Sequence, residues 1–199
     1  MPKFINPKLQ SLYERLLNLT DSPLYQYRTE NNYVPVLGEG NEKAKIMFIG
    51  EAPGQKEAES GRPFVGAAGR VLDELLLGIG LKREDIFISN IVNDRPPKNR
   101  DPLPAELTLY SPILAELIRT IQPKVIATLG RYSMQYMLET CKLPESGQTI
   151  TVLHGKTLPV KASYGTMNIV ALYHPAVALY NGGMKKTLQK DFEILKKFI

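Results

Sequence analysis

Two side chains that can do chemistry follow apolar runs of this sequence, each where a strand is expected to end. Glu51 is the second residue of the Gly/Pro-rich segment 50–54, which directly follows the run 46–49, while His174 follows the run 169–173. The carboxyl ends of strands in an open α/β sheet form the usual ligand-binding crevice. A carboxylate and an imidazole across one cleft could stabilise a cation, orient water or donate a proton.

Strands and helices are predicted to alternate along the chain, which indicates a parallel sheet covered on both faces. The periodicity predicts helices at 6–19, 66–77, after Pro104, at 131–139 and at 183–198, strands at 45–50, 86–92, 124–130 and 168–173, and a hairpin within 141–165. We therefore expect a three-layer α/β/α sandwich with a central, mainly parallel four-stranded sheet. No linker or internal repeat is visible, so residues 1–199 are expected to form a single domain.

The composition is that of an ordinary globular protein, with 43% hydrophobic and 23% charged residues among 199. A single cysteine excludes an intramolecular disulfide framework and a self-contained cysteine metal site. No apolar stretch approaches the roughly 20 residues of a membrane span. We therefore expect a cytoplasmic protein without membrane association. The net charge of +5 favours polyanionic partners.

Five sequence blocks resemble those of a known enzyme family. They are, in order, GEAPGQKE, GRPFVGAAGR, SNIVNDRPPKNR, PKVIATLG and HPAVAL. Together they resemble the uracil-DNA glycosylases, and most closely the bacterial and archaeal iron–sulfur type known as family four. The resemblance extends from about Leu19 to the C-terminus.

The resemblance implies that a base flipped out of DNA is held by Phe64 and Asn90. Phe64 matches the aromatic residue that stacks on uracil, and Asn90 matches the residue that reads the base edge. One carboxamide can pair with both O4 and N3–H of uracil, whereas cytosine inverts both groups and would leave them unpaired. The backbone amides around Ala52, Pro53 and Gly54 are expected to complete the pocket.

Three further residues of these blocks match the family's reactive groups. His174 matches the catalytic histidine, which would donate to uracil O2 as negative charge grows there. Glu51 is the acidic member of the first block, and the resemblance implies a catalytic role, either stabilising the oxocarbenium-like sugar or orienting water. Glu57 matches a glutamate near the base, with a solvated loop glutamate as the competing interpretation. His154 is expected to be a surface residue of the hairpin.

Residues beside the pocket loops are expected to contact DNA. Leu179 resembles part of the segment that fills the gap left by the flipped base. The predicted phosphate contacts are Arg62, Arg70, Arg95, Lys98 and Arg100.

The sequence departs from the family pattern at the cluster. The four cysteine positions of the family fall near Leu19, Ser22, Asp94 and Tyr110, and the lone Cys141 matches none of them. Because a four-iron cluster needs about four thiolates, we predict no cluster, no other cofactor and no metal site. The loop that a cluster would fix must then be held otherwise, with Tyr110 and the prolines of 96–104 as candidates.

The leading hypothesis is a monofunctional, monomeric glycosylase that removes uracil from single- or double-stranded DNA without a metal. Two alternatives stay open: a DNA-binding module of the same fold, or a glycosylase for another deaminated base. Loss of the cluster, and Ala176 where the family usually has Ser, motivate the first. A nucleotide-binding protein ranks last, because the first loop has neither a Walker lysine nor GxGxxG spacing.

Overall fold

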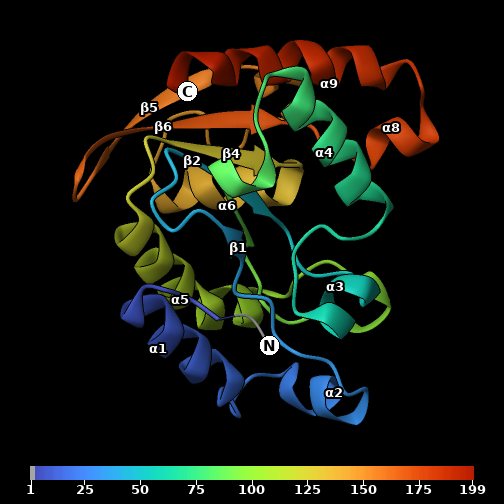
Figure 1. The fold of residues 1–199 in the computed structure, drawn as a ribbon, viewed down its shortest axis with the longest axis vertical. Coiled ribbons are helices and arrows are strands. Elements are labelled where there is room, and N and C mark those ends of the chain that lie inside the picture. The colour runs from blue at the N-terminus through green and yellow to red at the C-terminus, as the bar shows by residue number, and fades with distance from the viewer. Residues whose placement is uncertain (1–2) are drawn as a thin grey trace.

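A computed structural model describes residues 3–199 and shows a sheet with helices on both faces (Figure 1). The sheet has six strands in the order β1-β3-β2-β4-β6-β5. Their bounds are β1 Glu39–Gly40, β2 Ile46–Gly50, β3 Phe87–Asn90, β4 Val125–Leu129, β5 Thr157–Ala162 and β6 Gly165–Leu172. The predicted α/β/α class is confirmed.

The four predicted strands are β2, β3, β4 and β6, and they run parallel at the centre of the sheet. The prediction of four strands in total was wrong, because β1 and β5 add antiparallel edges. The two-residue β1 is too short to show alternating hydrophobicity. A hairpin was expected within 141–165, but the one observed lies further along the chain, where β5 pairs with β6, the strand predicted at 168–173.

The helices cover the two faces of the sheet, and all the predicted ones are present. Four short helices, α2, α3, α7 and α8, were not predicted. The bounds are α1 Pro7–Leu17, α2 Tyr25–Glu30, α3 Gln55–Ser60, α4 Ala67–Gly78, α5 Pro104–Ile121, α6 Arg131–Thr140, α7 Ile150–Leu153, α8 Val177–Tyr180 and α9 Met184–Phe192, with 3₁₀ segments at Arg83–Asp85, Pro97–Asn99 and Glu193–Phe198.

The central strands are buried on both faces, which explains their continuous apolar sequence. Ile46 and Phe48 of β2 belong to a core shared with α4 and α9, and the rings of Phe48 and Phe192 stack at 5.8 Å. Met47 and Ile49 belong to the opposite core, which includes residues of α1, α5 and α6. Because successive side chains of a strand point to opposite faces, alternate residues of β2 pack against the two helical layers.

The register of the parallel strands brings their carboxyl ends to one edge. Gly50 at the end of β2 pairs with Asn90 at the end of β3, and Leu129 of β4 pairs with Leu172 of β6. Glu51 and His174 follow β2 and β6 on this edge. The fold therefore gathers residues that are far apart in sequence.

Between residues 3 and 199, none of the helices combines the length and apolar character needed to cross a bilayer.

Candidate active site

A cavity of about 270 Å³ opens at the carboxyl edge of the sheet. It is lined by Glu51, Ala52, Pro53, Gly54, Glu57, Phe64, Ala68, Asn90, Pro96, Asn99, Arg100 and His174. The two residues predicted to be catalytic and the six predicted to bind substrate are all part of this lining. Of the predicted DNA contacts, only Arg100 lines it.

Glu51 lies half-buried at the first position after β2. The pKa of its carboxyl group is raised to about 7, chiefly by burial and then by the negative charge of Asp101, while the positive charge of Arg131 opposes both. Asp101 is held by a hydrogen bond from the Tyr132 hydroxyl and lies 3.7 Å from the Arg131 guanidinium. Near neutral pH this carboxyl group can therefore exist in either protonation state.

His174 is deeply placed, and burial lowers the pKa of its imidazole. The ring is therefore neutral at neutral pH. Its Nδ1 accepts a hydrogen bond from the backbone N–H of Ala176 at 3.2 Å. Since a neutral imidazole carries one proton, that proton is on Nε2, where it is available for donation.

Phe64 forms one wall of the cavity and is only 8% exposed. Its ring centroid lies 5.7 Å from that of His174, with 32° between the ring planes. The backbone of Phe64 is left-handed, with φ of 51°, which is uncommon for a bulky residue. The aromatic face and the imidazole thus border the same small space.

Asn90 ends β3 and is 2% exposed, so its carboxamide is almost entirely withdrawn from solvent. It packs directly on Gly50, where a Cβ would lie 2.5 Å from Asn90 Oδ1 and 2.8 Å from Phe64 Cε2. This close approach requires glycine at position 50. The Asn90 carboxamide and the Phe64 ring therefore both lie against the backbone of Gly50.

Glu57 on α3 is bound to the backbone and is not a solvated loop residue. Its Oε1 accepts hydrogen bonds from the N–H groups of Val65 and Gly66, both at 2.8 Å. The carboxylate therefore fixes the turn that carries Phe64 while also lining the cavity.

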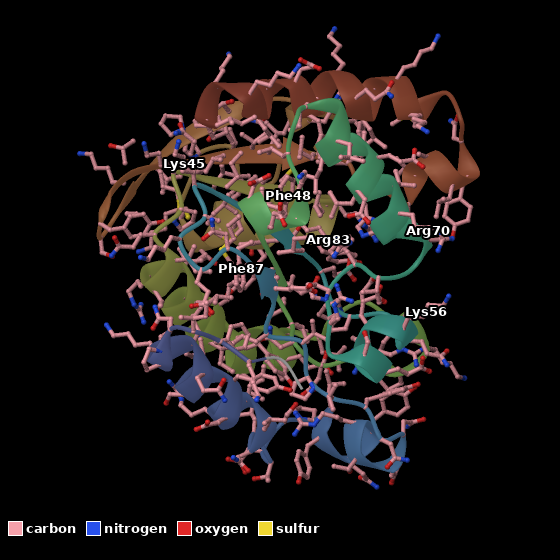
Figure 2. The ribbon with its side chains drawn as sticks, in the orientation of Figure 1. Lys45, Phe48, Lys56, Arg70, Arg83 and Phe87 are labelled. Atoms are coloured by element: carbon pink, nitrogen blue, oxygen red, sulfur yellow. The ribbon has the colours of Figure 1, made fainter. Side chains whose placement is uncertain are left out.

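The predicted phosphate contacts differ in how they are held. Arg70 and Lys98 are exposed, and Figure 2 shows Arg70 at the margin of the molecule. The other three have partners: Arg62 pairs with Glu39, Arg95 donates to Tyr33 and Asn99, and Arg100 makes two bonds to the buried Glu106. On α8, Leu179 is 47% exposed and its neighbour Tyr180 is 89% exposed.

His154 departs from the prediction of a surface hairpin residue. It lies between α7 and β5, and its Nδ1 is 2.8 Å from Asp191 Oδ2 on α9. Its ring centroid is 4.7 Å from that of Tyr173. Partners on two other elements, which the local sequence does not show, make it a half-buried structural residue.

The expected cluster positions are occupied by a buried hydrogen-bonded network. The Ser22 hydroxyl lies 2.7 Å from the Tyr110 hydroxyl, which donates to Asp94. Arg28 Nη1 lies 3.1 Å from Asp94 Oδ2, and the exposed fractions of these two side chains are 6% and 1%. Arg28 also donates to the carbonyls of Leu16 and Leu17.

This oxygen and nitrogen set does not fit an iron–sulfur cluster, which needs thiolates. Ser22, Asp94 and Tyr110 are already joined to one another, and Leu19 packs against the core. The expectation that Tyr110 helps to hold the loop is met. Tyr110 does so through hydrogen bonds with Ser22 and Asp94. Asp94 is also held by a buried ion pair with Arg28, a residue that no sequence motif indicated.

Sequence reasoning overlooked Ala68, Pro96 and Asn99 of the lining. It also overlooked Asp101 and Arg131, whose charges act on Glu51. The density of Pro, Asn and Arg in 95–101 was the available indication, because such loops follow strand ends in α/β sites.

Comparisons with known proteins agree with this geometry. A family model described as the uracil DNA glycosylase superfamily matches residues 37–197. A type-4 uracil-DNA glycosylase of Sulfurisphaera tokodaii is 44% identical over 95% of this chain and 84% of its own length. A type-4 enzyme of Thermotoga maritima is 35% identical over 96% and 94%, and a type-5 enzyme of Thermus thermophilus is 30% identical over 70% and 68%.

Proposed function

Because this chain belongs to the uracil DNA glycosylase superfamily, we propose that it removes uracil from DNA by hydrolysing the N-glycosidic bond. The observation that carries the proposal is that Glu51, Phe64, Asn90 and His174 line one cavity. Each supplies a different part of the chemistry that base excision needs. Their joint placement is more than a DNA-binding module requires.

Recognition of the base is assigned to Phe64 and Asn90. The flipped base enters the cavity and stacks on the Phe64 ring, which offsets part of the unstacking cost of a few kcal/mol. The buried Asn90 carboxamide donates to uracil O4 and accepts from N3–H. Cytosine presents the opposite donor and acceptor, so the Asn90 carboxamide would be left unpaired, and at 2% exposure it has little access to water in compensation.

Bond cleavage is assigned to His174 and Glu51. The Nε2 proton of the neutral imidazole is donated as a hydrogen bond to O2 of the leaving base, where negative charge develops. The Glu51 carboxylate stabilises the cationic sugar or orients the attacking water. None of the described residues that line the cavity is a lysine, so no Schiff base with the sugar is expected.

DNA is held by the rim of the cavity. Arg70 and Lys98 are exposed and available to phosphates, while Arg62, Arg95 and Arg100 are pre-positioned by their partners. Leu179 fills the gap left in the duplex. The exposed apolar surface of α8 supports this assignment.

The enzyme is proposed to work without an iron–sulfur cluster or another cofactor, on single- or double-stranded DNA. The Ser22–Tyr110–Asp94–Arg28 network supports this, because it occupies the expected ligand positions. A single-domain, monomeric and cytoplasmic protein is proposed. In support, one family model spans residues 37–197, and the single cysteine, Cys141, has no second cysteine in the chain with which to form a disulfide.

Uracil excision is tested with end-labelled oligonucleotides carrying uracil opposite guanine, opposite adenine, or in a single strand. Alkali is expected to cleave the strand at uracil after incubation, and omission of alkali should leave the strand intact. Matched thymine oligonucleotides are the control and should remain uncut. Uncut uracil DNA with enzyme in excess would contradict the proposal. Cleavage of a hypoxanthine substrate alone would indicate a different base.

The pH dependence is expected to follow the ionisation of Glu51. Since the carboxylate is the active form and its pKa is about 7, kcat/KM should fall about tenfold per unit below that pH. Asp101→Asn removes a negative charge that raises this pKa. Its acid limb should therefore move to lower pH.

The pH profiles of wild type, Asp101→Asn and Asp21→Asn are compared at constant ionic strength. Asp21 is exposed, so its variant should retain the wild-type profile. An acid limb that does not move in Asp101→Asn would show that the limb belongs to another group.

A further inference from the structure

The backbone of Phe64 is in a conformation that must be imposed by its surroundings. A left-handed backbone is unfavourable for a residue other than glycine, and Phe64 has φ of 51°. The direction of its ring follows from that backbone, since the side chain is attached to a turn rather than to a helix or strand. Whatever holds the turn therefore also sets the stacking surface.

Arg83 holds the carbonyl side of this turn. Its Nη1 donates to Pro63 O at 2.9 Å and its Nη2 donates to Phe64 O. Its Nε donates to Asp73 Oδ1 on α4 at 2.6 Å, which anchors the guanidinium. In Figure 2, Arg83 lies within the outline of the fold, whereas Arg70 lies at its margin.

The opposite side of the turn is held by the Glu57 carboxylate through the N–H groups of Val65 and Gly66. The turn is thus bound between an anion on its amides and a cation on its carbonyls. Phe64 O also packs on the first turn of α4, where a Cβ on Gly69 would lie 1.7 Å away. A substitution of Arg83 would remove the hydrogen bonds to the Pro63 and Phe64 carbonyls, and the carbonyl side of the turn would then be less restrained.

We propose that Arg83 is a positioning residue for base stacking, acting on the flipped base through the Pro63–Phe64 turn. It is not among the described residues that line the cavity, so it acts without touching substrate. The planar fork of arginine donates to three acceptors at once, which a lysine ammonium on a flexible stem does not reproduce. This inference rests on the proposed function.

The test is a double-mutant cycle with Phe64, followed by single-turnover excision of uracil. Phe64→Leu keeps apolar volume but removes the ring, and is expected to slow excision by about 10- to 100-fold. Arg83→Met, which keeps the unbranched stem, is expected to slow it by about tenfold, and Arg83→Lys to restore only part of the rate. In the Phe64→Leu background, Arg83→Met should change the rate by less than about twofold.

Arg15→Met is the matched control, because it also breaks an arginine–carboxylate pair, with Glu116, but on α1. Thermal unfolding of each variant shows that the assay is run on folded protein. If Arg83→Met fails to fold, Asp73→Asn is used instead, because it weakens the contact that anchors the Arg83 guanidinium. Asp73→Asn should slow excision by less than Arg83→Met does, and that slowing should likewise disappear in the Phe64→Leu background. Wild-type excision is measured first, so failure of the proposed function is seen there, independently of the variants.

Equal slowing by Arg83→Met in both backgrounds would overturn the inference, because the effect would not pass through Phe64. So would a wild-type rate in Arg83→Met.

Discussion

Replacing Glu51 with Gln is expected to slow the single-turnover excision of uracil by about a thousandfold. Gln keeps the shape of the side chain and its hydrogen-bonding reach but cannot carry negative charge. Glu51 lies half-buried in the cavity wall, where screening by water is reduced. Its charge therefore acts strongly on a cationic sugar or on the attacking water.

Glu59→Gln is the matched control for this substitution. Glu59 lies exposed on α3 and accepts a hydrogen bond from Gln55, away from the cavity lining. Its variant should excise uracil at the wild-type rate. A Glu51→Gln enzyme within tenfold of wild type would show that the charge is not the source of catalysis, and His174 would then have to supply most of the rate.

Replacing Asp94 with Ala is expected to destabilise the protein by about 3–5 kcal/mol, because it leaves the buried Arg28 guanidinium without its negatively charged partner. For a chain of this size that lowers the Tm by roughly 10 °C. Tyr110 also loses its acceptor, and burial with the adjacent Asp94 charge already raises the pKa of this phenol. The substitution therefore removes one buried hydrogen-bond acceptor from both Arg28 and Tyr110.

Thermal unfolding of Asp94→Ala is compared with that of Asp21→Ala, which removes an exposed carboxylate next to Ser22 in the sequence. The control should unfold at the wild-type temperature. If the two variants have equal Tm values, the network does not support the fold and packing around Leu19 and the prolines must do so.

The central layers of the fold could be predicted from sequence because burial on both faces leaves an unmistakable pattern. Strands such as Ile46–Gly50 and Val125–Leu129 are buried at every position, and Thr128 is the single polar residue within these two strands. Helix α2 gives no such pattern, because its only buried residue is Arg28. From the sequence alone, a charged residue such as Arg28 is expected to be exposed to solvent. Its burial becomes understandable only with its partner Asp94, which is distant in the sequence.

The cavity lining was predictable where chemistry is attached to strand ends, as it is for Glu51, Asn90 and His174. Their functional roles stay predictions until they are tested. Arg83 was not predictable, because its acceptors are backbone carbonyls that any sequence would provide. The Asp191 partner of His154 was equally hidden, since the two lie 37 positions apart.

The close approach of Gly50 and Gly69 to Asn90 and Phe64 has a consequence for how this protein can diversify. Any side chain at position 50 would meet Asn90 Oδ1 and the Phe64 ring, and any at position 69 would meet Phe64 O. Variants at these positions should therefore be lost by selection before they explore new bases. Ala68 and Asn99 line the cavity without this constraint, so they are better positions for changes in base preference. A mutant library aimed at altered base preference should therefore randomise these two positions and keep both glycines.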